Sequence, residues 1–193
     1  MTTILSQHDL VRGRLKFLRS LKEKLFIYPT DTIYGLGCNA EDAELVESLR
    51  LVKEQFVRPL SVIAPNMSWI RKNCVITSLA QPWLKRLPGP YTLILKLRHR
   101  AVAPNVDLGS NKIGVRLPDH WFTNWVGDIG IPIVTTSVNR PASAFMTDLD
   151  SLPKEIERGV DFVVYDGELM GCPSKIVDLT FHLNRRMVYL RKA

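Results

Sequence analysis

The chain has 193 residues, with 26 Lys and Arg against 19 Asp and Glu, a formal net charge of +7 and 46% hydrophobic residues. This length and composition predict one folded domain, residues 1–193, and exclude an intrinsically disordered chain. The sequence also lacks an apolar run near the roughly 20 residues of a membrane span and the charged and apolar regions of a secretory signal. We therefore expect a cytoplasmic protein with no membrane partner.

Alternating helix and strand patterns follow one another along the chain. Ser6 and Asp9 form a capping-box pair that begins a helix, and we place its apolar stripe at Val11, Leu15 and Leu18. The next elements predicted are a buried strand at 25–28, the turn-rich segment PTDTIYGLGCNA, a helix over 41–52, a strand over 60–64 and two short helices with N-caps at Ser68 and Ser78. Further strands are predicted at 92–97, 113–117, 133–137, 162–165, 176–179 and 187–190, and further helices after Asp119 and over 152–158. Strands interleaved with helices predict an α/β fold with a mixed sheet.

Charge is unevenly distributed between the two halves. Residues 1–100 carry 16 Lys and Arg against 8 Asp and Glu, whereas the rest carries 10 against 11. A basic half indicates an anionic partner such as a nucleotide, pyrophosphate or RNA, although a solvated surface also uses lysines. The three cysteines and four histidines are scattered, which predicts neither a disulfide framework nor a metal site built by the protein. A metal ion would arrive with a phosphate ligand, as Mg²⁺ does.

One short motif is a tempting signal for a dinucleotide. Residues 35–40, GLGCNA, match the pattern G-x-G-x-x-G/A between a strand and a helix. Six residues separate it from the preceding strand, and the position about 20 residues further on holds Lys53-Glu54-Gln55 rather than an acidic residue after a second strand. A nicotinamide or flavin site is therefore the weaker alternative, and the sequence contains no P-loop for ATP.

Four segments concentrate the chemistry. In YPTDTIYGLG, the hydroxyls of Thr30 and Thr32 could bind a small polar ligand or only shape a turn. Lys53 and Arg58 follow a helix, where cations also complement the helix dipole. Thr135 to Arg140 end a strand with small polar groups, as a crevice beyond strand ends requires. The fourth segment is GCPSKIVD, at 171–178.

Together these segments resemble the YrdC-like family, the threonylcarbamoyl-AMP synthases. The shared motifs are YPTDTIYGLG, PGPYT at 88–92, GVRLP at 114–118, SVN at 137–139 and PSKIVDLT at 173–180, in the family's order over about residues 20 to 192. The resemblance implies a single-domain twisted mixed sheet with flanking helices and a concave basic cleft. Because the chain is too short to contain the extra C-terminal domain of the longer family branch, we expect the short form of the family.

The resemblance further implies a reaction in which L-threonine, bicarbonate and ATP give threonylcarbamoyl-adenylate and pyrophosphate, with Mg²⁺ accompanying ATP. Partner proteins then transfer the group to tRNA. Positioning and charge neutralisation would dominate such chemistry. By motif, threonine would be bound by Thr30, Thr32, Arg116, Ser137 and Ser174, and ATP by Lys53, Arg58, Lys112, Asn139, Thr147 and Arg191. Of these, Lys53, Arg58, Ser137 and Asn139 are the candidate catalytic residues. For Thr147 and Arg191 an ordinary structural role is an equal alternative.

Two positions depart from the family pattern. The family's K-x-R motif reads Lys53-Glu54-Gln55 here, and glutamine cannot replace a guanidinium's charge. Arg58 then either substitutes for the missing cation or occupies the neighbouring polar position. Lys175 stands where a small hydroxyl residue is usual, and it either contacts an anion or faces solvent. An alternative hypothesis is a non-catalytic RNA-binding module of the same fold, for tRNA or double-stranded RNA.

Overall fold

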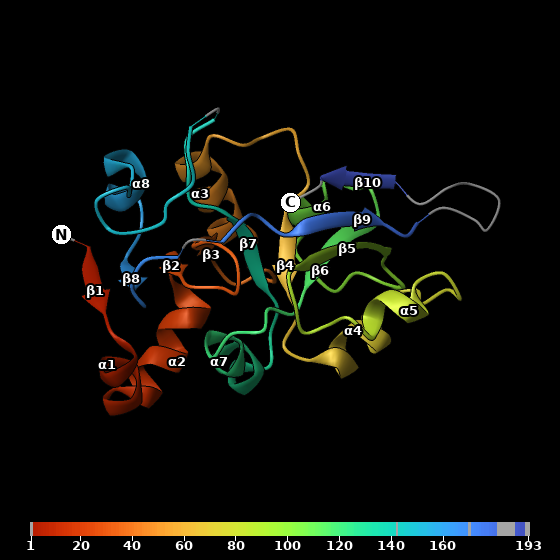
Figure 1. Ribbon diagram of the computed structural model, residues 1–193, viewed down its shortest axis with the longest axis horizontal. Coiled ribbons are helices and arrows are strands. Elements are labelled where there is room, and N and C mark those ends of the chain that lie inside the picture. Colours follow the sequence, from red (N-terminus) through yellow and green to blue (C-terminus); the bar gives the residue numbers. More distant parts are fainter. Residues whose placement is uncertain (1, 142, 170, 181–187, 192–193) are drawn as a thin grey trace.

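The computed structural model describes residues 2–141, 143–169, 171–180 and 188–191, and ten strands in these residues form one mixed sheet (Figure 1). Its order is β1-β8-β2-β3-β7-β4-β6-β5-β9-β10. The strands are β1 (Thr3–Leu5), β2 (Phe26–Tyr28), β3 (Gly35–Gly37), β4 (Ser61–Ile63), β5 (Tyr91–Lys96), β6 (Lys112–Arg116), β7 (Ile133–Ser137), β8 (Phe162–Val164), β9 (Lys175–Asp178) and β10 (Val188–Arg191). The α/β class and the mixed sheet predicted from the sequence are confirmed.

Helices cover both faces of this sheet. They are α1 (Gln7–Arg12), α2 (Arg14–Glu23), α3 (Ala43–Lys53), α4 (Met67–Asn73), α5 (Gln81–Leu84), α6 (Pro104–Asp107), α7 (Phe122–Ile129) and α8 (Lys154–Arg158). In Figure 1, α1, α2 and α7 lie on one side of the strands, and α3, α6 and α8 lie on the other. None of these helices has the length and hydropathy needed to cross a bilayer.

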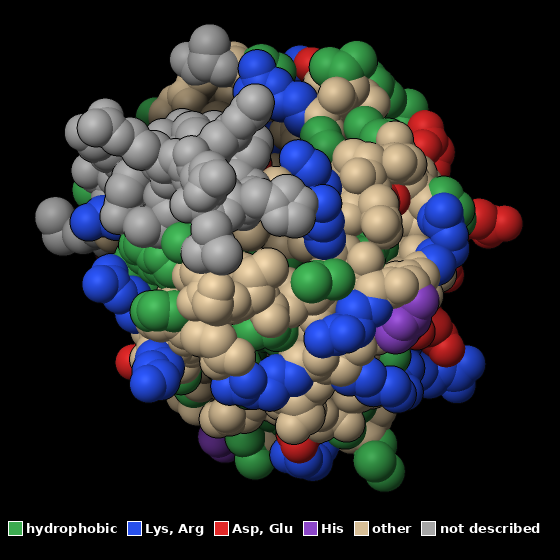
Figure 2. Space-filling view, turned by 90° about the vertical axis from the view of Figure 1, so that its right-hand side faces the viewer, with side chains coloured by type: hydrophobic (Ala, Val, Ile, Leu, Met, Phe, Trp, Pro, Cys, Tyr) green, Lys and Arg blue, Asp and Glu red, His purple; other side chains and the backbone are tan. Residues whose placement is uncertain are grey.

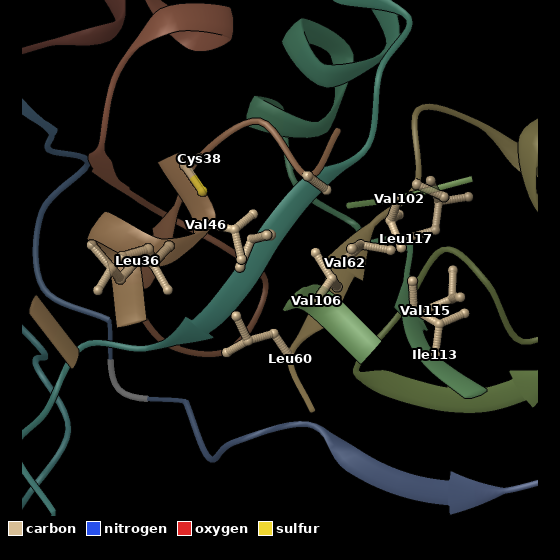
Figure 3. Close-up of a cluster of buried hydrophobic side chains, with 14 of the residues drawn as sticks. Leu36, Cys38, Val46, Leu60, Val62, Val102, Val106, Ile113, Val115 and Leu117 are labelled. Atoms are coloured by element: carbon tan, nitrogen blue, oxygen red, sulfur yellow. The ribbon is translucent and has the colours of Figure 1, made fainter. Parts of the chain in front are cut away.

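The strand register gives the two faces of the sheet different chemistry. Leu36, Val62 and Val115 belong to one face, which packs against α3 and α6 in the larger of two hydrophobic clusters (Figure 3). Residues one position along each strand face the other way. Beneath α1, α2 and α7 that second face packs into the smaller hydrophobic cluster, to which Phe26 and Phe122 belong. Further along the sheet the second face carries polar side chains and leaves space for a ligand.

The N-terminal helix is confirmed at its start but not along its predicted stripe. Ser6 and Asp9 form the capping box, and Gly13 interrupts the helix between α1 and α2. The predicted stripe is wrong at Val11 and Leu15, which are 64% and 83% exposed, whereas Leu18 is partly buried and packs against the smaller cluster. The break at Gly13 shifts the helical phase, so the side chains that enter the core are Leu10, Phe17 and Leu21.

The segment Gly35–Gly37 is a strand, not the phosphate-binding turn that a dinucleotide fingerprint requires. Its glycines make room for an aromatic ring. A Cβ at Gly35 would lie 2.8 Å from the Tyr28 ring, and one at Gly37 would lie 2.7 Å from it. The close approach that glycine permits therefore serves core packing, and it explains the G-x-G spacing without a cofactor.

Other predicted elements agree with the structure within one or two residues, apart from some helix caps. Asn66, not Ser68, caps α4 by accepting the Trp69 amide at 2.8 Å, and α5 has no side-chain cap at Ala80 where Ser78 was predicted to supply one. The sequence patterns also missed β1, β3 and α6. All three elements are short, with three or four residues each, so a period is hard to detect in them.

Candidate functional site

Two adjoining cavities lie on the polar part of the second sheet face. The Arg116 cavity has a volume of about 280 Å³ and is lined by Ile33, Tyr34, Gly35, Gln55, Arg58, Pro59, Leu60, Ser61, Thr92, Arg116, Thr135, Thr136, Ser137, Ser174 and Ile176. The Lys53 cavity has a volume of about 410 Å³ and is lined by Lys53, Glu54, Gln55, Phe56, Val57, Arg58, Ser137, Asn139 and Pro141. Gln55, Arg58 and Ser137 line both cavities, so these two spaces form one continuous site.

A third cavity, of about 760 Å³, lies beside α7. Its described lining contains neither lysine nor arginine. The Arg116 and Lys53 cavities hold the polar motifs that the sequence singles out, and they are therefore the candidate site.

Arg116 is the charged centre of the Arg116 cavity. One of its terminal nitrogens donates to Asp31 at 2.8 Å and to the Thr32 hydroxyl at 3.0 Å. The other Asp31 oxygen accepts the backbone amide of Asp119. Arg116 Nε has no hydrogen-bond partner in the described residues, and burial lowers the pKa of the guanidinium despite Asp31. A buried guanidinium with an unused donor is suited to a carboxylate ligand.

Hydroxyl groups surround this charge. Thr30 accepts the amides of Thr32 and Ile33 and donates to the Ile33 carbonyl, so it fixes the turn that holds Asp31. Ser174 and Thr92 share a hydrogen bond of 2.7 Å at the bottom of the cavity, and both side chains are buried. Such an arrangement favours a small ligand that has its own hydroxyl, amine or carboxylate groups.

The segment that carries Ser174 packs closely on the Thr30 turn. A Cβ at Gly171 would lie 2.0 Å from the Thr32 carbonyl oxygen, so only glycine allows this contact. The late motif at 171–178 and the early motif at 28–37 are thereby brought to the same cavity, although some 140 residues separate them in the sequence.

Lys53 is the centre of the second cavity. Its ammonium donates to the backbone carbonyl of Asn139 and to the Asn139 side-chain oxygen, the latter at 2.6 Å. The same side-chain oxygen accepts the Ser137 hydroxyl at 2.7 Å. Burial lowers the pKa of Lys53 to about 8, because loss of solvent disfavours the charged ammonium. The K-x-R and S-x-N motifs are therefore in direct contact.

An exposed rim borders the Lys53 cavity. Glu54 has left-handed backbone geometry, with φ 55°, and its carboxylate pairs with Arg140 at 2.7 Å. Phe56 is 50% exposed and Val57 is 86% exposed. Arg58 lines both cavities, which supports its interpretation as the substitute for the cation missing at Gln55.

The structure gathers most of the predicted site residues. Arg116, Ser137, Ser174, Lys53, Arg58 and Asn139 line the cavities, and Thr30 and Thr32 hold Arg116 in place. Lys112 begins β6 and Thr147 contacts Ser151, and neither lines either cavity. The backbone of Arg191 pairs with Ile176 in the sheet, but its side chain lies outside the described residues. Lys175 is exposed and lies outside both linings.

Sequence reasoning missed the hydroxyl of Ser61, which none of the quoted motifs contains. Ser61 is the register partner of Thr135 on the adjacent strand, and Thr92 lies further across the same face. Thr135 and Thr92 belong to segments that the sequence singles out, although the resemblance assigns their side chains no ligand. Ser61 could have been found from its alternation with Leu60 and Val62, because a polar residue between buried apolar neighbours marks the opposite sheet face.

Carboxylates are scarce around the two cavities. In the described linings Glu54 is the single acidic residue, and it is paired with Arg140. No group of three or more His, Cys, Asp or Glu in the described parts of the chain could hold a metal ion. Magnesium at this site would thus take most of its ligands from phosphate and water, which is the coordination that Mg²⁺ usually keeps.

The comparisons with known proteins agree with this geometry. Residues 20–193 match the family model Sua5/YciO/YrdC, described as telomere recombination. The chain belongs to this family.

Three relatives illustrate its range. A Methanocaldococcus jannaschii protein provisionally named threonylcarbamoyl-AMP synthase is 32% identical over 170 residues, which are 86% of this chain and 80% of that protein. The uncharacterised protein YciO of Escherichia coli K12 is 26% identical over 178 residues, 90% of this chain and 85% of its own. Sua5 of P. abyssi, solved with L-threonine, superposes with a TM-score of 0.83 at 25% identity. That match covers 99% of this chain and 57% of the Sua5 chain, so this chain spans little more than half of Sua5.

Family membership and the mixed-sheet fold are thus established, and relatives named threonylcarbamoyl-AMP synthase support an enzyme of the nucleotidyltransferase type. The strongly positive charge predicted for the concave face remains a prediction.

Proposed function

We propose that this protein is a threonylcarbamoyl-AMP synthase. In the reaction, the amine of L-threonine and bicarbonate form a carbamate with loss of water. A carbamate oxygen then bonds to the α-phosphorus of ATP, and the bond to the β-phosphate oxygen breaks to release pyrophosphate. The products are threonylcarbamoyl-adenylate, pyrophosphate and water.

One observation carries the proposal: the buried guanidinium of Arg116 and the ammonium of Lys53 belong to adjoining cavities that share Ser137. Arg116 would bind the threonine carboxylate, and the hydroxyl pair of Ser174 and Thr92 would lie beside the rest of the amino acid. Lys53 and Arg58 would bind phosphate oxygens. The carbamate would then meet the α-phosphate where the two cavities join.

The lining residues suggest how the reaction is accelerated. Both cavities lack a serine–histidine or cysteine–histidine pair among their described residues, so covalent catalysis is not part of the proposal. Holding two reactants in contact replaces a bimolecular encounter. Fixed cations at the phosphates stabilise the charge of the leaving pyrophosphate. Ser137 and Asn139 would orient the Lys53 ammonium, which they already contact.

Magnesium would accompany the triphosphate and neutralise part of its charge. Glu54 is the one described carboxylate that could approach it, either directly or through water. Lys112, Thr147 and Arg191 stay candidate ATP contacts by family resemblance alone. A tRNA and its transfer proteins would consume the adenylate, and we propose them as the downstream partners.

The test is pyrophosphate release by the purified protein in the presence of ATP, with L-threonine and bicarbonate each omitted in turn. We expect release to require both, and to fall to background in Asn139→Ala, which removes the side-chain oxygen that Lys53 and Ser137 share. Threonine-independent hydrolysis of ATP, or equal release by the two proteins, would contradict the proposal.

A second candidate function, RNA binding, is favoured by a separate surface. No Asp or Glu occurs between Glu54 and Asp107, whereas eight Lys and Arg do. All eight are exposed and form no ion pair with a carboxylate in the described residues. Apart from Arg58 of the candidate site, they are Arg71, Lys72, Lys85, Arg86, Lys96, Arg98 and Arg100. Figure 2, which views the right-hand side of Figure 1, shows Lys and Arg side chains across this face and acidic side chains toward its margins.

The end of α4 and the end of β5 are joined on this surface, because Val75 donates to the Lys96 carbonyl at 2.8 Å. Lys72 and Lys96 would therefore contact the same stretch of phosphates. We expect a tRNA mobility shift that weakens with salt and is lost in the double variant Lys72→Glu, Lys96→Glu. The matched control is Lys16→Glu, Lys22→Glu on α2, which changes net charge equally. Loss of binding in both double variants would show that only net charge matters, and absence of any shift would remove this candidate.

A further inference from the structure

Arg50 is a buried cation that the proposed reaction does not use. It lies on α3, one turn before Lys53, and is 2% exposed. No ion pair with a carboxylate is found for it in the described part of the chain. Burial lowers the pKa of its guanidinium, and the nearby Glu47 offsets this only in part. A charge in this environment requires many hydrogen bonds to be tolerated.

Those hydrogen bonds all go to backbone carbonyls. Arg50 Nε and one terminal nitrogen donate to the Asn105 carbonyl at 2.9 and 2.7 Å, and the latter nitrogen also reaches Val106 at 3.5 Å. The other terminal nitrogen donates to the carbonyls of Gln55 at 2.6 Å and Arg58 at 3.1 Å. The guanidinium thus joins the loop formed by residues 54–60 to the start of α6 and the segment around it.

This 54–60 loop has little else to hold its middle. At one end the Gln55 amide donates a hydrogen bond to the Arg50 carbonyl, and at the other end the Leu60 amide donates to the Val106 carbonyl. Between them, Phe56 and Val57 expose half or more of their side chains and bury little surface. The two loop carbonyls that Arg50 binds belong to Gln55 and Arg58, which are two of the three residues that line both cavities.

We propose that Arg50 is a positioning residue: it fixes the 54–60 loop against α6 and so aims Gln55 and Arg58 into the junction of the two cavities. A planar fork of five donors suits this task, whereas an ammonium has three donors and no fixed plane. The expected effect of Arg50 on ATP binding rests on the proposed function. The hydrogen bond from Arg50 to the Arg58 carbonyl also explains how this chain, with glutamine in the K-x-R motif, presents a cation to the site: Arg50 holds the backbone from which the Arg58 side chain projects.

Amide hydrogen exchange tests the loop without reference to catalysis. In Arg50→Met, which keeps the length of the side chain but removes its donors, we expect exchange in the peptide covering 54–60 to accelerate at least about tenfold. Arg50→Lys should give an intermediate exchange rate in this peptide. It also provides a second variant if Arg50→Met does not fold. The control is Val46→Ala, which removes buried side-chain atoms from the same helix and leaves every donor of Arg50 in place.

Calorimetry then links the loop to the site. Compared at matched residual stability, Arg50→Met should bind ATP at least about tenfold more weakly than Val46→Ala, because misplaced binding groups lose most of their contribution. Threonine binding should change less than ATP binding, since Arg116 and Ser174 are held by other elements. Millimolar guanidinium added to Arg50→Ala should recover part of the ATP affinity by occupying the vacated space.

The outcomes separate the inference from the proposed function. If the unaltered protein fails to bind ATP, the proposed function falls, while hydrogen exchange still decides whether Arg50 holds the loop. If exchange at 54–60 in Arg50→Met equals that in Val46→Ala, Arg50 contributes only to general stability and the inference is overturned. Faster exchange with unchanged ATP affinity would also overturn it, because the loop would then not position Arg58.

Discussion

The two cavities of the site are built in opposite ways. Around Arg116, the polar groups are buried and most are held by one another: Asp31 and Thr32 hold the guanidinium, Thr92 holds Ser174, and Arg116 Nε is left for a ligand. The Lys53 cavity has a buried ammonium at its base but a rim of exposed loop residues and a half-exposed ion pair between Glu54 and Arg140. One cavity is formed before any ligand arrives, while the exposed side chains on the rim of the other can change rotamer on a backbone that Arg50 holds.

This difference matches what each cavity would bind. A small amino acid offers few contacts, so its recognition depends on groups that are already in position. A triphosphate is large and highly charged, and it brings enough favourable contacts to order exposed side chains around itself. Of the two departures from the family pattern, Gln55 falls in the rim of the Lys53 cavity, whereas Lys175 is exposed and lies outside both linings. Neither departure changes a residue that contacts Arg116.

The largest effect is expected at Arg116. Arg116→Met should weaken threonine binding by about 10- to 150-fold, because a hydrogen bond to a charged group contributes about 1.5–3 kcal/mol and the cavity has no second guanidinium in this position. It also strands the buried Asp31, which should cost about 3 kcal/mol of unfolding free energy. Calorimetry with L-threonine and thermal unfolding measure the two effects.

The matched control for Arg116 is Arg14→Met. Arg14 pairs with Asp128 at the same distance of 2.8 Å, but their side chains are 55% and 38% exposed. Threonine binding should be unaffected and the stability change should stay below about 1 kcal/mol. Equal losses in the two variants would mean that the Arg116 cavity is not the preformed site described above.

A smaller effect is expected in the rim of the Lys53 cavity, where the cation can be removed from position 58 and restored at position 55. Arg58→Met should weaken ATP binding by about ten- to thirtyfold, in line with about 1.5–2 kcal/mol for a charged contact that is partly exposed. In the reverse direction, Gln55→Arg restores the family's cation and should strengthen ATP binding. The double variant Gln55→Arg, Arg58→Met should recover much of the loss. A double variant no better than Arg58→Met would show that Arg58 does more than substitute for the missing charge.

Lys53 gives the site a pH dependence whose sign follows from burial. Its pKa is lowered to about 8, so its ammonium is charged at pH 7 and largely neutral at pH 9. ATP affinity should therefore fall by up to about tenfold between these values. Over the same interval the folded protein binds fewer protons than the unfolded chain, so the contribution of Lys53 to stability rises with pH. A Lys53→Met variant should show neither change, and a pH profile that it shares with the unaltered protein would refute the assignment.

Much of this site could be predicted from the sequence, and the exceptions have physical causes. Thr30, Arg116, Ser137 and Ser174 lie in motifs whose order and spacing survive intact. Arg50 could not be found, because it has the helical position of a core residue and its partners are backbone carbonyls that no sequence displays. The N-terminal stripe failed for a related reason, since Gly13 breaks the helical period. Local patterns thus predict elements and motif residues well, but contacts between distant backbones remain invisible to them.

The smallest effect is expected at Thr147, and it tests how far the ATP site extends. By family resemblance it is a candidate ATP contact, yet its hydroxyl lies 3.5 Å from the Ser151 hydroxyl and it lines neither cavity. Thr147→Val keeps the shape and removes the hydroxyl, and we expect ATP affinity to change less than about twofold, well under the value of one hydrogen bond. Ser151→Ala should change it equally little. If Thr147→Val weakens ATP binding tenfold while Ser151→Ala does not, the nucleotide extends beyond the Lys53 cavity toward this segment, and the adjustable part of the site is larger than the rim at 54–58.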